Sequence, residues 1–270
     1  MSVTLTVYGP IRPLHSGHYG NWAPNPAMRL AQLLATMKAP DGTVLVDGWE
    51  DDVTPLGAAE RAALAAYPAD DEAERLQFQL GSTDGAGRPR ADLITHPSLN
   101  VRGLRSLFVG PEARTLIPDV AVAELDLRLV DGNDPRRQVD KLVRHLERQG
   151  YRVVAEAPDS ATRVRSARLV QVQSDSGYPA GRTRLDDPAA RAVVAALAAA
   201  GLGEPVILPT LGGSGPAYVF TDILRTPFVA LPTVNHDNNQ HAENENVRLG
   251  NVYRAMEILA AAAGARLDRR

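Results

Sequence analysis

The 270-residue chain lacks cysteine and is short of lysine, and the absence of cysteine narrows the kinds of site that it can contain. Without cysteine there can be no disulfide, zinc ribbon or thiol nucleophile, so any metal has to be held by histidine, aspartate or glutamate. Of the 29 basic residues only Lys38 and Lys141 are lysines, a bias from which we draw no function. The formal net charge of −3 gives no electrostatic reason to expect a nucleic acid or an anionic membrane as partner.

Long apolar runs are also missing. The longest, residues 192–202, is too short to span a bilayer. The first ten residues, MSVTLTVYGP, lack the basic region and apolar run of a signal peptide. We therefore expect a cytoplasmic protein without a membrane partner. The length fits one large domain or two ordinary ones.

The first 172 residues predict a ferredoxin-like domain. Strand periodicity occurs at residues 2–9, 98–110, 120–130 and 151–157, and helical spacing at 26–38 and 135–149. If residues 43–97 are an insertion, the order is β-α-β-β-α-β, the split βαβ arrangement of ferredoxin-like sheets. Alternation along 120–130 places Glu124, Asp126 and Arg128 on one face of the sheet.

Residues 173–270 show a different pattern, in which helices and strands alternate. Helices are expected at 187–201, after the Gly-rich turn TLGGSG and at 247–264, and strands at 205–209 and 226–232. A two-stranded sheet with three helices covers itself poorly. We therefore predict a ferredoxin-like α+β domain followed by an incomplete α/β portion.

A polar loop, NHDNNQHAENENVRLGN at residues 235–251, contains two histidines. His241 is a candidate metal ligand, because imidazole nitrogen suits zinc and neighbouring carboxylates can ligate or orient it. The spacing from His236 to His241 is not the i, i+4 pair of zincins, and a solvated polar loop is the alternative interpretation. A metal site needs several ligands, so His241 requires partners from elsewhere.

Two glycine-containing loops could bind an anion. His15, in PLHSGHYGNW, can donate a hydrogen bond to an oxyanion, although the same residues suit an ordinary β–α loop. In TLGGSGP (210–216), the backbone N–H groups around Gly213 and Ser214 can hold a carboxylate, although a tight turn explains them equally well.

Arg128 lies on a strand, where it could grip a substrate carboxylate with two hydrogen bonds. An ordinary surface salt bridge is the alternative. Thr115, in the ARTLIP turn, carries no information alone. The order of all these motifs along the chain is more specific than any one of them.

Four segments together resemble a known family over nearly the whole chain. They are VYGPIRPLHSGHYGNWAPNPAMRLAQLLATMKAPDGTVLVDGW, SLNVRGLRSLFVGPEARTLIPDVAVAELDLRLVDGNDP, LGGSGPAYVF and DNNQHAENENVRL. They are similar to the lid and C-terminal motifs of the zinc dipeptidase, carboxypeptidase and aminoacylase family, with the carnosinase-like dipeptidases as the nearest branch. The resemblance implies that residues 1–172 form a lid that dimerises, and that residues 173–270 are the C-terminal portion of the catalytic domain.

The same resemblance implies roles for individual residues. His241 matches the last histidine ligand of one metal in a two-zinc site. His15 matches the lid histidine that, in dimeric members, reaches the partner subunit's active site and stabilises the oxyanion. The positions implied to contact the carboxylate or backbone of the substrate are Thr115, Arg128, Gly213 and Ser214.

The sequence departs from the family in lacking the long N-terminal catalytic segment. That segment carries a His-x-Asp metal motif, a bridging aspartate and a Glu-Glu pair with the general base. We therefore expect a metallopeptidase or amidohydrolase for small peptides or acylated amino acids that is inactive alone, binds zinc weakly, forms a homodimer through its lid and could need a separate N-terminal catalytic polypeptide. The alternatives are a non-catalytic dimerisation module and a small-carboxylate binder that uses Arg128 and the Gly-Gly-Ser turn.

Overall fold

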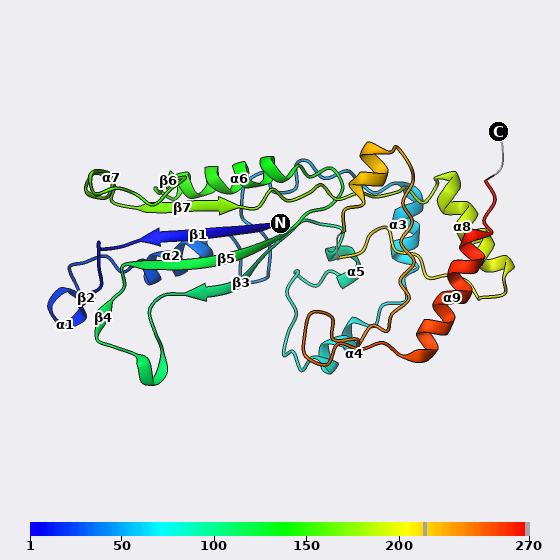
Figure 1. The fold of residues 1–270 in the computed structure, drawn as a ribbon, viewed down its shortest axis with the longest axis horizontal. Helices are drawn as coiled ribbons and strands as arrows, with labels where there is room; N and C mark the ends of the chain where they lie inside the picture. Colours follow the sequence, from blue (N-terminus) through cyan, green and yellow to red (C-terminus); the bar gives the residue numbers. More distant parts are fainter. Residues whose placement is uncertain (213–214, 268–270) are drawn as a thin grey trace. The chain divides into compact units, whose positions relative to one another are not determined.

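The structure, a computed structural model, describes residues 1–212 and 215–267 (Figure 1). The chain divides into two compact units. The first comprises Met1–Thr54, Ala69–Ala180 and Gly212–Pro216, and the second comprises Pro55–Pro68, Gly181–Leu211 and Ala217–Arg270. Among the described residues, no helix is long and apolar enough to cross a bilayer.

A five-stranded mixed sheet in the order β3-β5-β1-β7-β6 forms the centre of the first unit. Its strands are β1 (Ser2–Tyr8), β3 (Ser98–Arg105), β5 (Val120–Arg128), β6 (Arg152–Val154) and β7 (Leu169–Ser174). Strand β1 runs antiparallel to both β5 and β7, β3 is antiparallel to β5, and β6 is parallel to β7. The mixed α/β architecture predicted for this part of the chain is confirmed.

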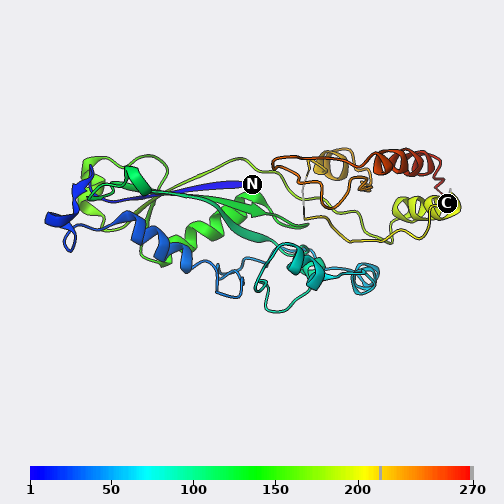
Figure 2. The same ribbon diagram turned by 90° about the horizontal axis from the view of Figure 1, so that it is seen from below.

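Two helices cover one face of this sheet (Figure 2). They are α2 (Pro26–Ala35) and α6 (Pro135–Arg148), and each begins at a proline preceded by a capping side chain. The Asn25 carboxamide oxygen accepts from the Ala27 N–H at 2.9 Å, and the Asp134 carboxylate accepts from the Arg137 N–H at 2.9 Å. A proline in the first turn and an Asn or Asp cap before it are the expected helix-starting pair.

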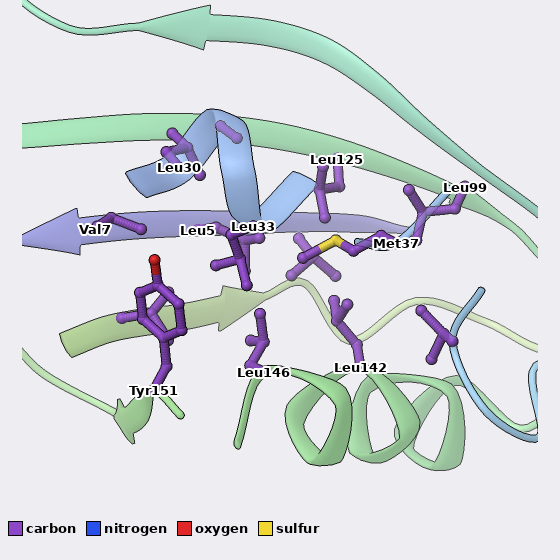
Figure 3. Close-up of a cluster of buried hydrophobic side chains, with 14 of the residues drawn as sticks. Leu5, Val7, Leu30, Leu33, Met37, Leu99, Leu125, Leu142, Leu146 and Tyr151 are labelled. Atoms are coloured by element: carbon purple, nitrogen blue, oxygen red, sulfur yellow. The ribbon is translucent and has the colours of Figure 1, made fainter. Parts of the chain in front are cut away.

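The hydrophobic core lies between the sheet and these two helices (Figure 3). Leu5 of β1 and Leu125 of β5 are fully buried, and Leu142 of α6 packs in the same cluster. Strand alternation produces this burial, because Ala121, Ala123, Leu125 and Leu127 face the helices while the residues between them lie on the opposite face.

One strand differs from the prediction. In the predicted β-α-β-β-α-β order the segment 151–157 is the last strand, but an additional strand, β7, lies next to β1, and β6 lies at the edge beyond it. Helix α7 (Ser160–Arg165), capped by Asp159, turns the chain, so that β7 returns along β1 with Val170 fully buried. Strand β7 therefore completes the ferredoxin-like arrangement, and β6 adds a short edge.

The predicted insertion contains three short helices, α3 (Ala58–Ala65), α4 (Asp71–Gln77) and α5 (Arg90–Leu93). Its first part is fastened to α6 by buried polar groups. The Gln138 side chain donates to the Trp49 carbonyl at 2.9 Å, and the Lys141 ammonium lies 2.8 Å from an Asp52 carboxylate oxygen. Residues 55–68 belong to the second unit rather than to the sheet-containing one.

The second unit contains the helices α8 (Pro188–Ala199) and α9 (Leu249–Ala263), which contact each other, and one π-helical turn, η2 (Val219–Ile223). The predicted strands 205–209 and 226–232 are wrong: within the described part of the chain neither segment pairs in a sheet. A strand needs a hydrogen-bonding neighbour. In the second segment the Phe228 N–H instead donates to the Thr183 hydroxyl at 2.8 Å.

Candidate functional site

A small two-stranded sheet brings His15 and Thr115 together. Strands β2 (Leu14–His15) and β4 (Leu116–Ile117) are antiparallel, with His15 opposite Leu116. The Ser16 N–H donates to the Thr115 carbonyl at 3.0 Å. His15 and Thr115, which come from different sequence motifs and are 100 positions apart in the chain, are thus neighbours in space.

The His15 ring is held by the loop that follows it. Its Nδ1 accepts from the Gly17 N–H at 3.1 Å, which makes His15 the N-cap of α1 (Ser16–Tyr19). A side chain at position 17 would interfere, because a Cβ there would lie 3.0 Å from the His15 Cε1. When Nδ1 accepts, the proton of a neutral imidazole is on Nε2. His15 is exposed, and no described residue accepts a hydrogen bond from its Nε2–H, which leaves a donor of the kind that an oxyanion requires.

Three aromatic rings extend from His15 along the same loop. His18 lies 4.7 Å from His15 between ring centroids, and Tyr19 and Trp22 lie 5.9 Å apart. His18 was not among the residues selected from the sequence. The signal that could have identified it is its i, i+3 spacing from His15 across one helical turn, which brings two side chains onto the same face.

Arg128 lies at the opposite end of β5 from the His15 hairpin. Strand β5 begins three residues after β4, and Arg128 is its last residue, about 25 Å farther along at the usual rise of an extended strand. Its Nε donates to an Asp126 carboxylate oxygen at 2.9 Å. Arg128 therefore forms the surface salt bridge that was the alternative interpretation of this residue. Because of the length of β5, His15 and Arg128 of one copy are too far apart to contact the same small substrate.

His241, in the second unit, lies in a loop closed by Asn235. The Asn235 side chain, which is 4% exposed, donates to Asp237 at 2.8 Å and to Asn246 at 3.1 Å, and it accepts from the Arg248 N–H at 3.0 Å. These bonds join the two ends of the loop. The Asn235 amide, together with the charge of Arg248, also holds the pKa of Asp237 below its ordinary value.

The loop presents His241 in an unusual backbone conformation. Its φ is +64°, in the left-handed region that residues other than glycine rarely adopt. The ring is exposed. Among the described residues, no three His, Asp or Glu side chains are grouped so that they could hold a metal ion. Zinc usually takes four ligands, so these residues alone do not fit a zinc site.

The Gly-Gly-Ser turn was predicted to contact the substrate through Gly213 and Ser214. Both residues lie outside the part of the chain that the structure describes. The preceding Gly212 belongs to the first unit, where a Cβ on it would lie 3.4 Å from the Ile94 side chain.

Comparison with known proteins identifies relatives along almost the whole chain. It is 26% identical over 262 residues to the Cys-Gly metallodipeptidase DUG1 of Saccharomyces cerevisiae, covering 94% of this chain and 51% of the relative. It is 24% identical over 249 residues to the Beta-Ala-His dipeptidase of Homo sapiens, covering 92% of this chain and 47% of the relative. The chain spans about half the length of the curated relatives it matches.

Solved structures show the same fold. An M20 family metallo-carboxypeptidase, Sso-CP2 from Sulfolobus solfataricus, superimposes with a TM-score of 0.76 at 25% identity, covering 97% of this chain and 56% of that one. The di-peptidase Dug1p from Saccharomyces cerevisiae superimposes with a TM-score of 0.77 at 22% identity, covering 97% and 53%. Residues 1–154 match the peptidase dimerisation domain of the M20 family. Since that match includes more than half of the 270 residues, the chain belongs to the M20 peptidase family and carries its dimerisation domain.

Proposed function

We propose that the chain is part of a metal-dependent dipeptidase that hydrolyses the peptide or amide bond of small substrates, such as dipeptides or acylated amino acids. Residues 1–172 would form the lid and residues 173–270 the C-terminal portion of the catalytic domain. Support comes from the alignment of more than 90% of the chain with a Cys-Gly metallodipeptidase and a Beta-Ala-His dipeptidase. The location of the protein in the cytoplasm stays a prediction.

The hydrogen bond from Gly17 to His15 is the observation that carries this proposal. Attack on an amide carbonyl places negative charge on the carbonyl oxygen, and a preoriented donor stabilises that charge. His15 supplies such a donor because Gly17 occupies Nδ1 and leaves the proton on Nε2. We assign His15 to the oxyanion, and Thr115, beside it on the hairpin, to the substrate backbone.

The other end of the substrate would be bound by Arg128 and by the turn that contains Gly213 and Ser214. Arg128 suits the carboxylate, because a guanidinium donates two parallel hydrogen bonds to it. The hairpin that carries His15 lies at the start of β5, and Arg128 lies at its end. We therefore propose a homodimer through the lid, in which His15 of one copy serves the site that contains Arg128 of the other.

We further propose that the metal is zinc and that His241 is one of its ligands. The described residues do not supply the remaining ligands. We propose that these ligands and the general base lie outside these 270 residues, and that the 270 residues alone do not hydrolyse peptides. A stretch of protein comparable in length to this chain is present in the relatives and unmatched here.

Hydrolysis of Cys-Gly and β-Ala-His, with zinc added, tests these assignments. We expect no turnover by the purified chain and turnover after addition of the polypeptide that carries the remaining ligands. In that complex, His15→Ala should lower kcat by about 10²–10³-fold, the usual cost of losing one oxyanion donor. His18→Ala is the matched control, since it removes the neighbouring ring and leaves the donor. Turnover by the 270 residues alone would contradict the proposal that the remaining metal ligands and the general base lie outside them. Full activity of His15→Ala in the presence of those groups would contradict the oxyanion role of His15.

A non-catalytic dimerisation module is the second candidate, and the match of residues 1–154 to a dimerisation domain favours it. The two candidates both predict a dimer in light scattering. They differ because only the dipeptidase gains activity from a catalytic partner. A strictly monomeric chain would argue against both.

A further inference from the structure

Arg128 differs from a freely moving surface arginine because one of its nitrogens is already bound. Asp126, two residues earlier on the same face of β5, accepts the Nε–H at 2.9 Å. Its side chain is only 21% exposed, whereas that of Arg128 is 48% exposed. The carboxylate is therefore the more enclosed partner, and the guanidinium the more accessible one.

The bond engages Nε and leaves the rest of the guanidinium available. Within the described residues, no side chain or carbonyl accepts a hydrogen bond from the two terminal amino groups of Arg128. Those two groups lie side by side in the plane of the guanidinium, at the separation of the two oxygens of a carboxylate.

We propose that Asp126 is a positioning residue that holds the Arg128 guanidinium through Nε, so that its terminal amino groups form a fixed fork for the carboxylate of the substrate. This inference rests on the proposed role of Arg128 in substrate binding. An arginine side chain has many rotamers, and ordering it on binding costs affinity. The hydrogen bond to Asp126 orders the Arg128 side chain already in the free protein, so that less conformational entropy is lost when the substrate binds.

The same carboxylate has a second, opposing effect. Its charge is close to that of the incoming ligand, and like charges repel at this range, although solvent screens them. Because Asp126 partly neutralises the charge of Arg128, the guanidinium recognises a carboxylate more by the matching geometry of the two groups than by charge attraction. If orientation outweighs repulsion, removal of the Asp126 side chain weakens binding, and if repulsion outweighs orientation, removal strengthens it.

Glu124 provides a control for charge on the same strand. It lies on the same face of β5, but it accepts a hydrogen bond from the Thr4 hydroxyl at 2.9 Å and lies 3.7 Å from Arg102. Glu124→Gln therefore removes one negative charge from this face without touching Arg128. Asp126→Asn removes the other charge and keeps an oxygen that can accept from Nε.

The experiment titrates the ¹⁵N-labelled 270-residue chain with glycylglycine, and separately with glycylglycinamide, which has no carboxylate. It follows the Arg128 Nε–H resonance where that residue is present, and the backbone amide resonances of β5 in every variant, Arg128→Ala included. We expect Asp126→Ala to weaken glycylglycine binding about five- to tenfold. Asp126→Asn and Glu124→Gln should bind at least as tightly as the unmodified chain. Without added ligand, the Nε–H should exchange faster with solvent only in Asp126→Ala.

The outcomes separate this inference from the proposed function. Suppose that Asp126→Ala binds glycylglycine as tightly as the unmodified chain, or more tightly, while Arg128→Ala loses binding. That result overturns the positioning role of Asp126 and leaves the proposed binding of the substrate carboxylate by Arg128 intact. If the unmodified chain binds glycylglycine and its amide equally, or responds to neither, Arg128 does not bind the carboxylate. The positioning role of Asp126 is then overturned as well. Equal weakening by Asp126→Ala and Glu124→Gln would identify a general charge effect and also overturn the inference.

Discussion

The two compact units of the chain bury their apolar residues to very different degrees. In the first, Leu5, Leu125 and Leu142 are completely shielded between the sheet and its helices. In the second, Met256 and Leu259 of α9 are largely exposed although α9 contacts α8. The composition of the two parts does not explain this, because α8 and α9 are rich in alanine and other apolar residues.

The difference shows what a sheet contributes. Strands present a continuous apolar face against which two helices can pack, whereas each helix that packs without a sheet buries one stripe. The first unit has such a sheet, and in the described residues of the second unit no strand is formed. We expect the free energy of unfolding to be concentrated in the first unit. The four measurements below test this difference between the units and the contribution of single groups within each unit.

The largest effect is expected from core leucines. Leu125→Ala should lower the free energy of unfolding by about 3 kcal/mol, because it leaves a cavity between β5 and the helices. Leu259→Ala, at a side chain that is 56% exposed, should change it by no more than about 0.5 kcal/mol. Urea unfolding followed by circular dichroism gives both values. Equal losses at the two positions would show that the second unit has a core of its own.

The two lysines allow a similar comparison within the first unit. Lys141, 6% exposed, lies 2.8 Å from Asp52, whereas Lys38 lies 3.6 Å from the exposed Asp84. Lys141→Met should cost about 2 kcal/mol, because it leaves the partly buried Asp52 with Arg137 as its one remaining ion-pair partner among the described residues. Lys38→Met should cost less than about 0.5 kcal/mol. Thermal and urea unfolding of both variants measure this, and equal costs would contradict a special role for the buried pair.

The Asn235 loop is the best-organised part of the second unit. Asn235→Ala removes three hydrogen bonds and should weaken the loop by about 2 kcal/mol. The Arg248 amide, which donates to Asn235, should then exchange with solvent about 30-fold faster in a hydrogen-exchange measurement. Asn239→Gly is the control, because Asn239 is exposed and its φ of +53° suits glycine. An unchanged Arg248 exchange rate would show that the loop ends are held by other means.

The smallest effect concerns pH. Burial, and then the charge of Arg148, lower the pKa of His145, whose Nε2 lies 2.9 Å from the Thr36 hydroxyl. The unfolded chain therefore binds a proton that the folded chain resists, and stability should fall as the pH falls below the ordinary histidine pKa of about 6.5. Above that pH the contribution is constant. In His145→Gln this acid-side loss should be smaller, as urea midpoints between pH 7.5 and 5 can show, and an identical slope in both proteins would contradict it.

The sequence predicted best where local chemistry decides the structure. Asn25-Pro26 and Asp134-Pro135 determined the starts of α2 and α6, and alternation along 120–130 determined which side chains of β5 face the core. The prediction from the sequence failed where the structure depends on which strands pair with each other. Residues 205–209 and 226–232 have strand-like composition, but no neighbouring strand pairs with them in the described structure. Strand β7 was missed because its place beside β1 depends on how α7 turns the chain.

For the candidate site, sequence reasoning selected residues but not their partners. His15 and Arg128 were chosen from motifs, yet the bonds that orient them, from Gly17 and to Asp126, follow from backbone geometry and strand alternation. The roles of Thr115 and His241 remain predictions. So do those of Gly213 and Ser214, which lie outside the described residues.

The separation of His15 and Arg128 along β5 has a genetic consequence. In a dimer whose two sites each take His15 from one copy and Arg128 from the other, a copy without His15 and a copy without Arg128 are defective in different ways. When the two are mixed, one site receives both defects and the other receives none. Two inactive alleles would thus restore activity in a heterozygote, to about a quarter of the normal level after random pairing. A site contained within one copy would give no such rescue.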